Sequence, residues 1–306
     1  MNYHDFKGEK ISKLTLGTAQ LGMKYGIANQ KGNLSIDEAN EIIKNAINFG
    51  INSFDTAQNY GQSEEILGKF LIDLENENFP IITTKISNIQ FNNYSELNFK
   101  ILNSIKNSQK KFYPNDPSIY LLHDVKNIEK DSDEIKKLQE LQKNRKIKWI
   151  GISTYTPLDV KKFLEIENLD VIQIPINIFD HRLLNTGLLE ELKEQKKLIF
   201  ARSIYLQGLF YLDLENIPEN LSSSKKFLKK LKEIAQMENL TSAELAFQFV
   251  KELESISSMI IGVETVEQLK QNIDLLNMPK MSENCKEEIM KEFNNIQENI
   301  INPTLW

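Results

Sequence analysis

The chain has 306 residues, of which 41% are hydrophobic and 26% charged, a composition typical of a globular protein with a substantial core. Its net charge of −6 argues against a nucleic-acid partner, because no overall positive field is available to hold phosphates. A single cysteine, Cys285, excludes an internal disulfide framework, and no apolar run approaches the ~18 residues of a membrane span, so we expect a cytoplasmic protein.

Short apolar runs alternate with longer amphipathic stretches along the whole chain. The runs are mostly β-branched and apolar at successive positions, which is typical of strands buried on both faces of a parallel sheet. Eight such strands are predicted, at residues 14–16, 51–54, 81–84, 119–122, 147–152, 171–176, 198–201 and 259–261.

Helix start and stop signals lie between these runs. Ser35 with Glu38 fits a capping box, and Gly50 ends the helix that it opens. Ser63 precedes two glutamates that suit the positive end of the next helix. Further helices are predicted at residues 94–110, 132–143, 157–166, 188–195, 225–237, 242–253, 265–275 and 282–296.

The alternation predicts an α/β fold, a single (β/α)8 TIM barrel that forms one domain over residues 1–306. The alternative is a doubly wound open sheet. That fold would show a glycine-rich phosphate-binding turn after the first strand, and residues 14–22 match its fingerprint poorly.

Four residues with chemistry to offer lie at or beside the ends of adjacent predicted strands. The second strand ends in Asp55, the third in Lys85 and the fourth in His123, while Tyr60 lies in the turn after the second. In a (β/α)8 barrel the strand ends form the catalytic rim. Asp55 alone could be a turn former, Tyr60 a packed aromatic and His123 a core histidine, but burying the Lys85 ammonium without a partner is costly.

Together these residues form a coherent proton-transfer set. Asp55 would neutralise Lys85, and a cation beside Tyr60 favours the phenolate, so that the hydroxyl can give or take a proton near neutral pH. His123 can donate a hydrogen bond to a carbonyl oxygen. None of the four is a hydride source, so a redox cofactor would have to supply it.

The chain resembles the aldo/keto reductase family over essentially its whole length. FDTAQNYG at residues 54–61, SEEILGK at 63–69, Thr84-Lys85 and Leu121-Leu122-His123 carry the resemblance. It implies NAD(P)(H)-dependent interconversion of a carbonyl and an alcohol, with Tyr60 as general acid/base, Asp55 and Lys85 tuning it, and His123 orienting the substrate.

The same resemblance implies a cofactor site along the later strands. Ser153 and Gln173 would contact the nicotinamide amide, residues 203–208 the pyrophosphate, and residues 261–272 the adenosine. Thr154 stands where the family commonly has Asn, and Ile204 where it has Pro. The implied cofactor-binding residues are Thr18, Ser153, Gln173, Ser203, Leu206, Gly208, Gly262, Glu264, Thr265, Gln268 and Asn272.

Glu264 bears on the choice between NAD and NADP. In many family members its position is basic or carries a hydroxyl and helps to bind the 2′-phosphate. A carboxylate repels phosphate but can accept a hydrogen bond from a ribose hydroxyl. We therefore hypothesise that NAD(H) is used at least as well as NADP(H), although Lys270 nearby could support phosphate binding.

The substrate is expected to be a sugar or sugar derivative. Related sequences that open like GTAQLGMKYGIAN suggest carbohydrate substrates, and the amides of Gln58 and Asn59 suit ligands rich in hydroxyls. Residues 22–29 are expected to lie over the pocket. Its predicted walls are Met23, Tyr25, Gln58, Phe179, Tyr205 and Phe210.

The sequence leaves other functions on the same fold open. A cofactor-binding redox sensor or regulatory protein would keep the fold but turn over little. A metal-dependent hydrolase would need His4, His123 and His181, but no His-x-His pair exists and we predict no metal. A purely structural barrel would leave Lys85 unexplained. We expect a monomer or a small homo-oligomer.

Overall fold

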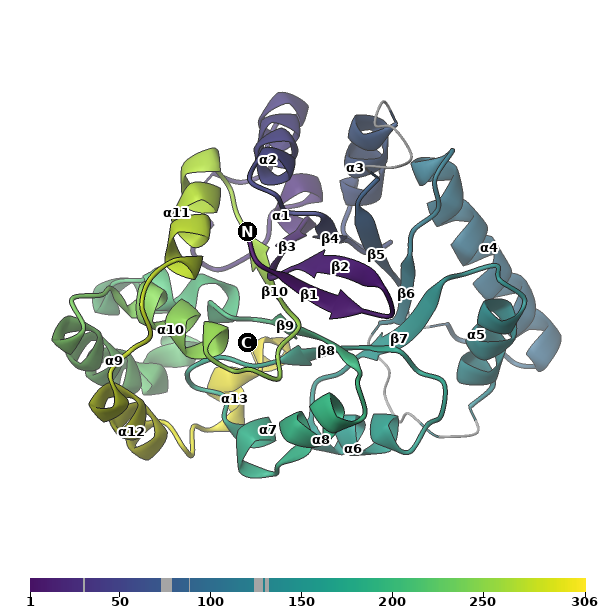
Figure 1. Cartoon of the computed structure of the whole chain (residues 1–306). Coiled ribbons are helices and arrows are strands. Elements are labelled where there is room, and N and C mark those ends of the chain that lie inside the picture. Colours follow the sequence, from purple (N-terminus) through teal and green to yellow (C-terminus); the bar gives the residue numbers. More distant parts are fainter. Residues whose placement is uncertain (30, 73–78, 88, 124–128, 130–131) are drawn as a thin grey trace.

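The computed structural model describes residues 1–29, 31–72, 79–87, 89–123, 129 and 132–306. In these residues, eight parallel strands close into a barrel in the order β10-β3-β4-β5-β6-β7-β8-β9, with helices around the outside (Figure 1). The barrel strands are β3 (Leu14–Gly17), β4 (Ser53–Asp55), β5 (Ile81–Ile86), β6 (Ile119–Leu122), β7 (Trp149–Ser153), β8 (Val171–Pro175), β9 (Leu198–Arg202) and β10 (Ser258–Gly262).

The predicted TIM barrel is thereby confirmed, and each predicted strand has its counterpart. The doubly wound alternative is wrong because the sheet closes on itself: β10 pairs in parallel with β3, with Met259 opposite Leu14. Closure leaves no edge strand in the barrel, which removes unpaired backbone donors and acceptors.

The helices follow the predicted pattern with small differences at their ends. Ser35 forms the expected capping box with Glu38, but the last long helix ends at Glu292 rather than at residue 296. The α-helices are α1 (Ala19–Gly22), α2 (Ile36–Asn48), α3 (Ser63–Leu71), α4 (Tyr94–Phe112), α5 (Asp133–Lys143), α6 (Pro157–Leu164), α7 (Arg182–Asn185), α8 (Leu188–Glu194), α9 (Lys225–Met237), α10 (Ser242–Lys251), α11 (Val266–Leu276), α12 (Glu283–Glu292) and α13 (Glu298–Ile301). Short 3₁₀ turns are η2 (Leu206–Tyr211), η3 (Leu214–Asn216), η4 (Glu219–Ser224) and η5 (Pro303–Leu305).

An antiparallel hairpin of β1 (Tyr3–Phe6) and β2 (Glu9–Ser12) precedes the barrel and was not predicted. It crosses the end of the barrel that faces the reader in Figure 1. Phe6 and Ile11 pack there into one apolar cluster with barrel residues that include Trp149 and Phe200. The hairpin therefore closes the amino-terminal end of the barrel.

Strand alternation decides which side chains enter the barrel. Ile81, Leu121, Trp149, Val171 and Phe200 belong to the interior cluster that the hairpin covers. The intervening residues, such as Ile82, Ile150 and Ile172, pack outward against the helices in the larger core. Because successive side chains alternate, every second residue beyond the interior cluster also points inward, toward the carboxyl-terminal mouth.

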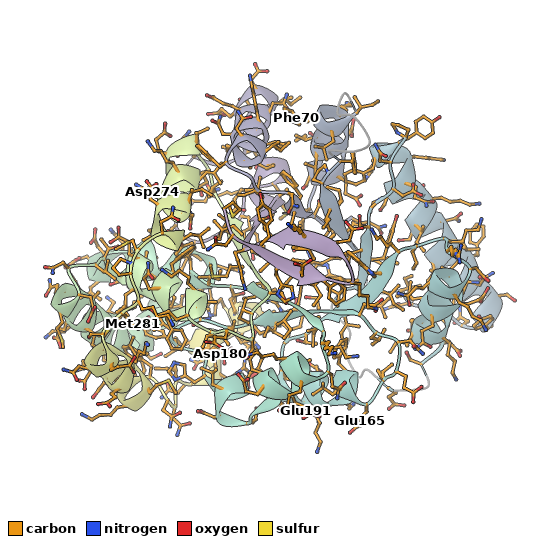
Figure 2. The ribbon with its side chains drawn as sticks, viewed as in Figure 1. Phe70, Glu165, Asp180, Glu191, Asp274 and Met281 are labelled. Carbon is orange, nitrogen blue, oxygen red and sulfur yellow. The ribbon has the colours of Figure 1, made fainter. Side chains whose placement is uncertain are left out.

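The outer surface of the helical ring is charged. Figure 2 shows Glu165, Glu191 and Asp274 at the periphery, and all three are exposed. Asp180 is instead buried, and its carboxylate pairs with Arg182 at 2.8 Å. Of the helices that the structure describes, none combines the length and the apolar character needed to cross a membrane.

Candidate active site

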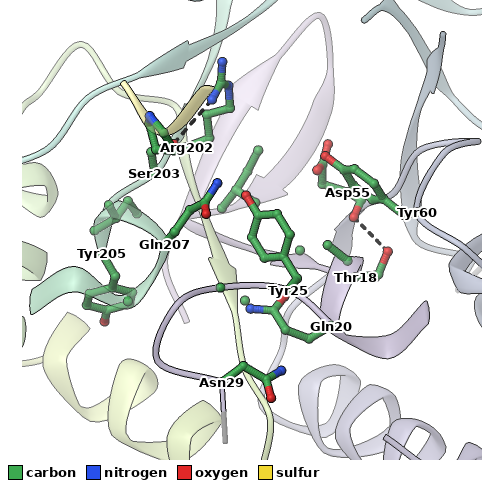
Figure 3. Close-up of a pocket in the computed structure, with 18 of the residues that line it drawn as sticks. Thr18, Gln20, Tyr25, Asn29, Asp55, Tyr60, Arg202, Ser203, Tyr205 and Gln207 are labelled. Carbon is green, nitrogen blue, oxygen red and sulfur yellow. Dashed lines mark hydrogen bonds between the residues drawn. The ribbon is translucent and has the colours of Figure 1, made fainter. Parts of the chain in front are cut away.

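A cavity of about 530 Å³ opens at the carboxyl-terminal ends of the strands (Figure 3). Its volume lies in the range of small-molecule sites. Strand ends of β4, β7, β8, β9 and β10 contribute to its walls, together with the loops after β3, β4 and β9 and the C-terminal residues Pro303 and Thr304. The cavity extends from Tyr60 and His123 to Glu264 and Asn272.

The Lys85 ammonium lies beneath this cavity in a full set of hydrogen bonds. It is 1% exposed, and its Nζ donates to both carboxylate oxygens of Asp55, at 2.8 and 2.7 Å, and to the Thr56 carbonyl at 3.0 Å. Burial lowers the pKa of Lys85, and the Asp55 carboxylate opposes that shift. Asp55 therefore keeps a cation in a place where an isolated one would be strongly destabilised.

Tyr60 and His123 complete the group. Lys85 Nζ lies 3.4 Å from Tyr60 Oη and 4.8 Å from the centre of the Tyr60 ring. The Tyr60 and His123 rings meet edge to face at 5.9 Å between centroids. The structure thus brings all four predicted catalytic residues together at the mouth of the barrel.

Close packing of two loops fixes the position of Tyr60. Gly61 has a φ of +56°, and a Cβ there would lie 2.3 Å from the Gly22 carbonyl oxygen. A Cβ on Gly22 would in turn lie 2.2 Å from the Tyr60 carbonyl oxygen. Only glycine fits at this contact, so the segment that carries Tyr60 rests directly on the end of α1.

Ser153 and Gln173 stand side by side in the next part of the cavity. They are opposite each other in the register of β7 and β8, and both line the cavity. Gln173 Nε2 donates a hydrogen bond to Asp55 Oδ1, while the buried Gln173 Oε1 has no partner among the described residues. A nicotinamide carboxamide, which carries N–H donors and a carbonyl acceptor, fits this pair.

The segment after β9 meets the loop after β3 across the cavity. Ile27 N donates to the Gln207 carbonyl at 2.9 Å, and a Cβ on Gly208 would lie 2.7 Å from the Ala28 Cβ. Ser203 and Gly208 line the cavity as expected for pyrophosphate contacts. Leu206 does not line it, because its side chain is wholly buried in the core.

The far end of the cavity is formed by β10 and the start of α11. Gly262, Glu264, Gln268 and Asn272 line it. Thr18 also lines the cavity, but beside Asp55, whose carbonyl accepts a hydrogen bond from Thr18 Oγ1 at 2.9 Å. Thr265 does not line the cavity; its hydroxyl caps α11 by accepting a hydrogen bond from Gln268 N at 3.2 Å.

The amide side chains at this end already form hydrogen bonds with another side chain or with the main chain. Gln268 Oε1 accepts a hydrogen bond from Glu264 N at 2.7 Å. Asn272 Oδ1 accepts one from the Tyr205 hydroxyl, and Asn272 Nδ2 donates to the Gln268 carbonyl at 2.7 Å. Partial burial raises the pKa of Glu264, and Lys31 opposes that shift.

The predicted pocket walls divide into two groups. Met23, Tyr25 and Tyr205 line the cavity, whereas Gln58, Phe179 and Phe210 do not. Gln58 Nε2 donates to the Ser104 carbonyl and to Ser108 Oγ, both at 2.9 Å, which holds its amide against α4.

Phe179 belongs to an aromatic cluster rather than to the cavity. It is 1% exposed, and its ring lies 5.0 Å from Phe210 and 4.9 Å from Phe293 between centroids. An aromatic residue in a loop after a strand can face a pocket or the core. The partner that draws Phe179 to the core, Phe293, lies more than a hundred residues away in sequence and could not be inferred.

Arg202 lines the cavity and was missed. A signal for it existed, because Leu198, Phe200 and Arg202 follow one another with the two-residue period of inward-facing side chains. Pro303 and Thr304 were missed as well, and nothing in the local sequence marks them.

The three histidines lie in different places. His4 is on β1 at the closed end of the barrel, His123 is at the mouth, and His181 is buried with its ring stacked on Phe249 at 5.1 Å. Among the residues described, no three His, Cys, Asp or Glu side chains gather as metal ligands would.

The model of the Aldo/keto reductase family matches residues 13–291. The "Uncharacterized oxidoreductase YqkF" of Bacillus subtilis is 28% identical over 294 residues, which cover 89% of this chain and 94% of that protein. The D-arabinose 1-dehydrogenase of Saccharomyces cerevisiae is 26% identical over 295 residues, which cover 90% of this chain and 85% of the other.

A solved structure agrees with the fold. An aldo-keto reductase from Bacillus halodurans, in its holo form, matches with a TM-score of 0.77 at 20% identity, over 100% of this chain and 99% of the other. At that identity the match supports the barrel architecture alone.

Proposed function

Since the chain belongs to the aldo/keto reductase family of oxidoreductases, we propose that it interconverts an aldehyde or ketone and the corresponding alcohol, with Tyr60 as the general acid/base. The observation that carries this proposal is the Lys85 ammonium, held by both oxygens of Asp55 and 3.4 Å from Tyr60 Oη. A cation at that distance stabilises the phenolate that proton donation leaves behind.

The residues divide the work of proton transfer. In reduction, Tyr60 gives its proton to the carbonyl oxygen while Lys85 stabilises the resulting phenolate; in oxidation, the phenolate takes the proton of the alcohol. His123, whose ring meets that of Tyr60, orients the oxygen by a hydrogen bond. NAD(P)(H), when bound, supplies or accepts the hydride.

The cofactor would lie along the cavity from Ser153 and Gln173 to the start of α11. The buried Gln173 Oε1, which has no hydrogen-bond partner within the described part of the chain, supports a carboxamide at the first end. The half-buried Glu264 carboxylate at the other end supports NAD(H) being accepted at least as well as NADP(H), because it disfavours a 2′-phosphate beside it.

The substrate we propose is a sugar or sugar derivative. The similarity to a D-arabinose 1-dehydrogenase supports this class. So does the cavity wall, in which Tyr25, Asn59 and Gln207 offer a hydroxyl and two amides to bind substrate hydroxyls.

A turnover screen tests the proposal. The unmodified protein is assayed by nicotinamide absorbance with aldoses, ketoses and simple aldehydes, in both directions and with NAD(H) and NADP(H). We expect turnover of several sugar carbonyls, with a kcat/KM for NAD(H) at least equal to that for NADP(H). Saturable cofactor binding without turnover of any carbonyl or alcohol would instead identify a cofactor-binding sensor.

A further inference from the structure

Arg202 brings a positive charge into the cavity. It is the last residue of β9, and it is half-buried. It lines the same cavity as Tyr60 (Figure 3) and His123. After burial, which has the largest effect, the positive charge of Arg202 contributes to lowering the pKa of Lys85.

Neutral groups hold the guanidinium in place. Its Nη2 donates to the Thr154 carbonyl at 2.7 Å and its Nη1 to Ser203 Oγ at 3.3 Å. The guanidinium carbon lies 4.4 Å from the centre of the Tyr155 ring, so the plane rests on an aromatic platform. Tyr155 is anchored in turn, because its carbonyl accepts a hydrogen bond from Arg182 Nη2 at 3.2 Å.

This positive charge has no countercharge in the part of the chain that the structure describes. Among the described lining residues, Asp55, Arg202 and Glu264 are charged. The Asp55 carboxylate accepts hydrogen bonds from Lys85 and Gln173. Glu264 lies at the end of the cavity that is formed by β10 and the start of α11. Arg182 shows the contrast, because it makes an ion pair with the buried Asp180 at 2.8 Å.

The geometry leaves donors free for a ligand. A guanidinium has five N–H donors, and Arg202 Nε is buried with no partner among the described residues. Arginine stays charged at all relevant pH values, and its planar fork matches carboxylate and phosphate oxygens. A guanidinium that is held in place, half-buried and without a countercharge among the described residues is therefore suited to bind an oxyanion.

The place of Arg202 favours the substrate as the source of that oxyanion. Arg202 is opposite Pro175 in the register of β9 and β8, and it bonds to Thr154 just after Ser153. Ser153 and Gln173 mark the reacting end of the proposed cofactor site, whereas its adenosine end lies across the cavity at β10 and α11.

We propose that Arg202 binds a carboxylate or phosphate group of the substrate, so that the preferred carbonyl compounds are sugar acids, sugar phosphates or similar anions. This inference rests on the proposed function and narrows its substrate class. Arg202 acts in it as a specificity-determining residue that recognises charge away from the reacting carbonyl.

Matched pairs of carbonyl compounds test the proposal. Glucuronate is compared with glucose, succinate semialdehyde with butyraldehyde, and glyceraldehyde phosphate with glyceraldehyde, in the unmodified protein and in Arg202→Met. We expect the unmodified protein to favour the anionic member of each pair in kcat/KM. Arg202→Met should lower that ratio by about 10- to 100-fold, the effect of losing a charged hydrogen bond.

Two further variants separate recognition from general charge effects. Arg202→Lys keeps the positive charge but loses the paired N–H donors of the guanidinium. Its ratio of kcat/KM for the anionic compound to kcat/KM for the neutral one should therefore lie between those of the unmodified protein and Arg202→Met. Lys24→Met removes an exposed cation from the loop between Met23 and Tyr25 and should leave the ratio unchanged. Circular dichroism of each variant checks that the fold is retained.

Three outcomes would overturn the proposal. One is an unmodified protein that prefers the neutral member of every pair. Another is an Arg202→Met variant that loses activity equally on both members while its Kd for NAD(H) or NADP(H) rises, which would assign the guanidinium to the cofactor diphosphate. If no carbonyl is turned over, the proposed function fails, and binding is measured instead by calorimetric titration with glucuronate and with glucose. Glucuronate binding that is the same in the unmodified protein and in Arg202→Met would then overturn this inference as well.

Discussion

Lys85 and Asp55 form the charged centre of the site. An ammonium that is 1% exposed would lose its proton or disrupt the fold without a compensating anion, and both Asp55 oxygens lie within 2.8 Å of it. Tyr60 lines the cavity, as Asp55 does, and its hydroxyl lies 3.4 Å from the cation. In the proposed function, the ion pair acts on the substrate through this hydroxyl.

Replacing Lys85 by Met should slow turnover and move its pH dependence. Without the cation the Tyr60 phenolate forms only at higher pH, so the rise of alcohol oxidation with pH should shift to higher pH. The loss of electrostatic stabilisation should lower kcat by about 100-fold or more.

The measurement is a pH–rate profile of alcohol oxidation for both proteins, with Lys69→Met as the control. Lys69 pairs with Glu65 on the surface of α3, away from the cavity, so its removal should leave the profile unchanged. Circular dichroism checks that Lys85→Met folds although Asp55 has lost its ion-pair partner. A folded Lys85→Met with the original profile would refute the tuning role.

At the level of elements, the loop after β4 is held by backbone contacts. Gly61 and Gly22 approach so closely that neither has room for a Cβ, and Ser63 N donates to the Tyr60 carbonyl at 3.0 Å. Thr18 Oγ1 donates to the Asp55 carbonyl at 2.9 Å, which ties the loop after β3 to the strand end that bears the acid. The Tyr60 phenol is therefore positioned by packing of the main chain.

Gly61→Ala should disturb both stability and catalysis. The new methyl group meets the Gly22 carbonyl at 2.3 Å in addition to the unfavourable φ of +56°. Gly32→Ala is a matched control, because Gly32 also has a positive φ, +81°, but open space around its Cβ position.

Denaturant unfolding should show Gly61→Ala to be less stable than Gly32→Ala by about 1–3 kcal/mol, the usual cost of overpacking. Its kcat should fall as well, because Tyr60 moves with the loop. Equal unfolding free energies for the two variants would show that the contact between the loops is not rigid.

The whole barrel is closed at one end and open at the other. The β1–β2 hairpin places Phe6 edge to face with Trp149, at 5.2 Å between centroids, on the side away from the cavity. The barrel interior thus divides into an apolar layer for stability and a polar layer for chemistry, in agreement with the general division of such folds.

Phe6→Ala should therefore lower the free energy of unfolding without changing the chemistry. Truncation of a buried phenylalanine typically costs about 3–5 kcal/mol. Denaturant unfolding measures that loss, and kcat/KM of the folded variant should match the unmodified protein. A changed kcat/KM would mean that the two layers are coupled.

The barrel strands and the four catalytic candidates could be predicted because both follow from local pattern. Buried parallel strands are continuously apolar, and a polar residue at the end of such a run, as at Lys85 or His123, stands out against it. The hairpin could not be predicted in this way, since YHDF and EKIS mix polar and apolar residues and only Phe6, Ile11 and Ser12 are buried.

The remaining parts of the site depend on contacts between distant segments. Phe179 follows β8 as a pocket residue would, but Phe210 and Phe293 draw it into the core. Thr304 reaches the cavity only because the C-terminal segment folds back over the barrel. Arg202 differs from both, because the alternation in β9 already places it inside.

Tyr60→Phe tests the central claim most directly, because it removes one oxygen atom and leaves the ring against His123. Steady-state turnover of an accepted carbonyl and the Kd of the reduced cofactor are measured for both proteins. Proton transfer through the hydroxyl predicts a kcat lower by about 100-fold or more, with the cofactor Kd nearly unchanged. A kcat within a few-fold of the unmodified protein would contradict the assignment of Tyr60 as the proton donor.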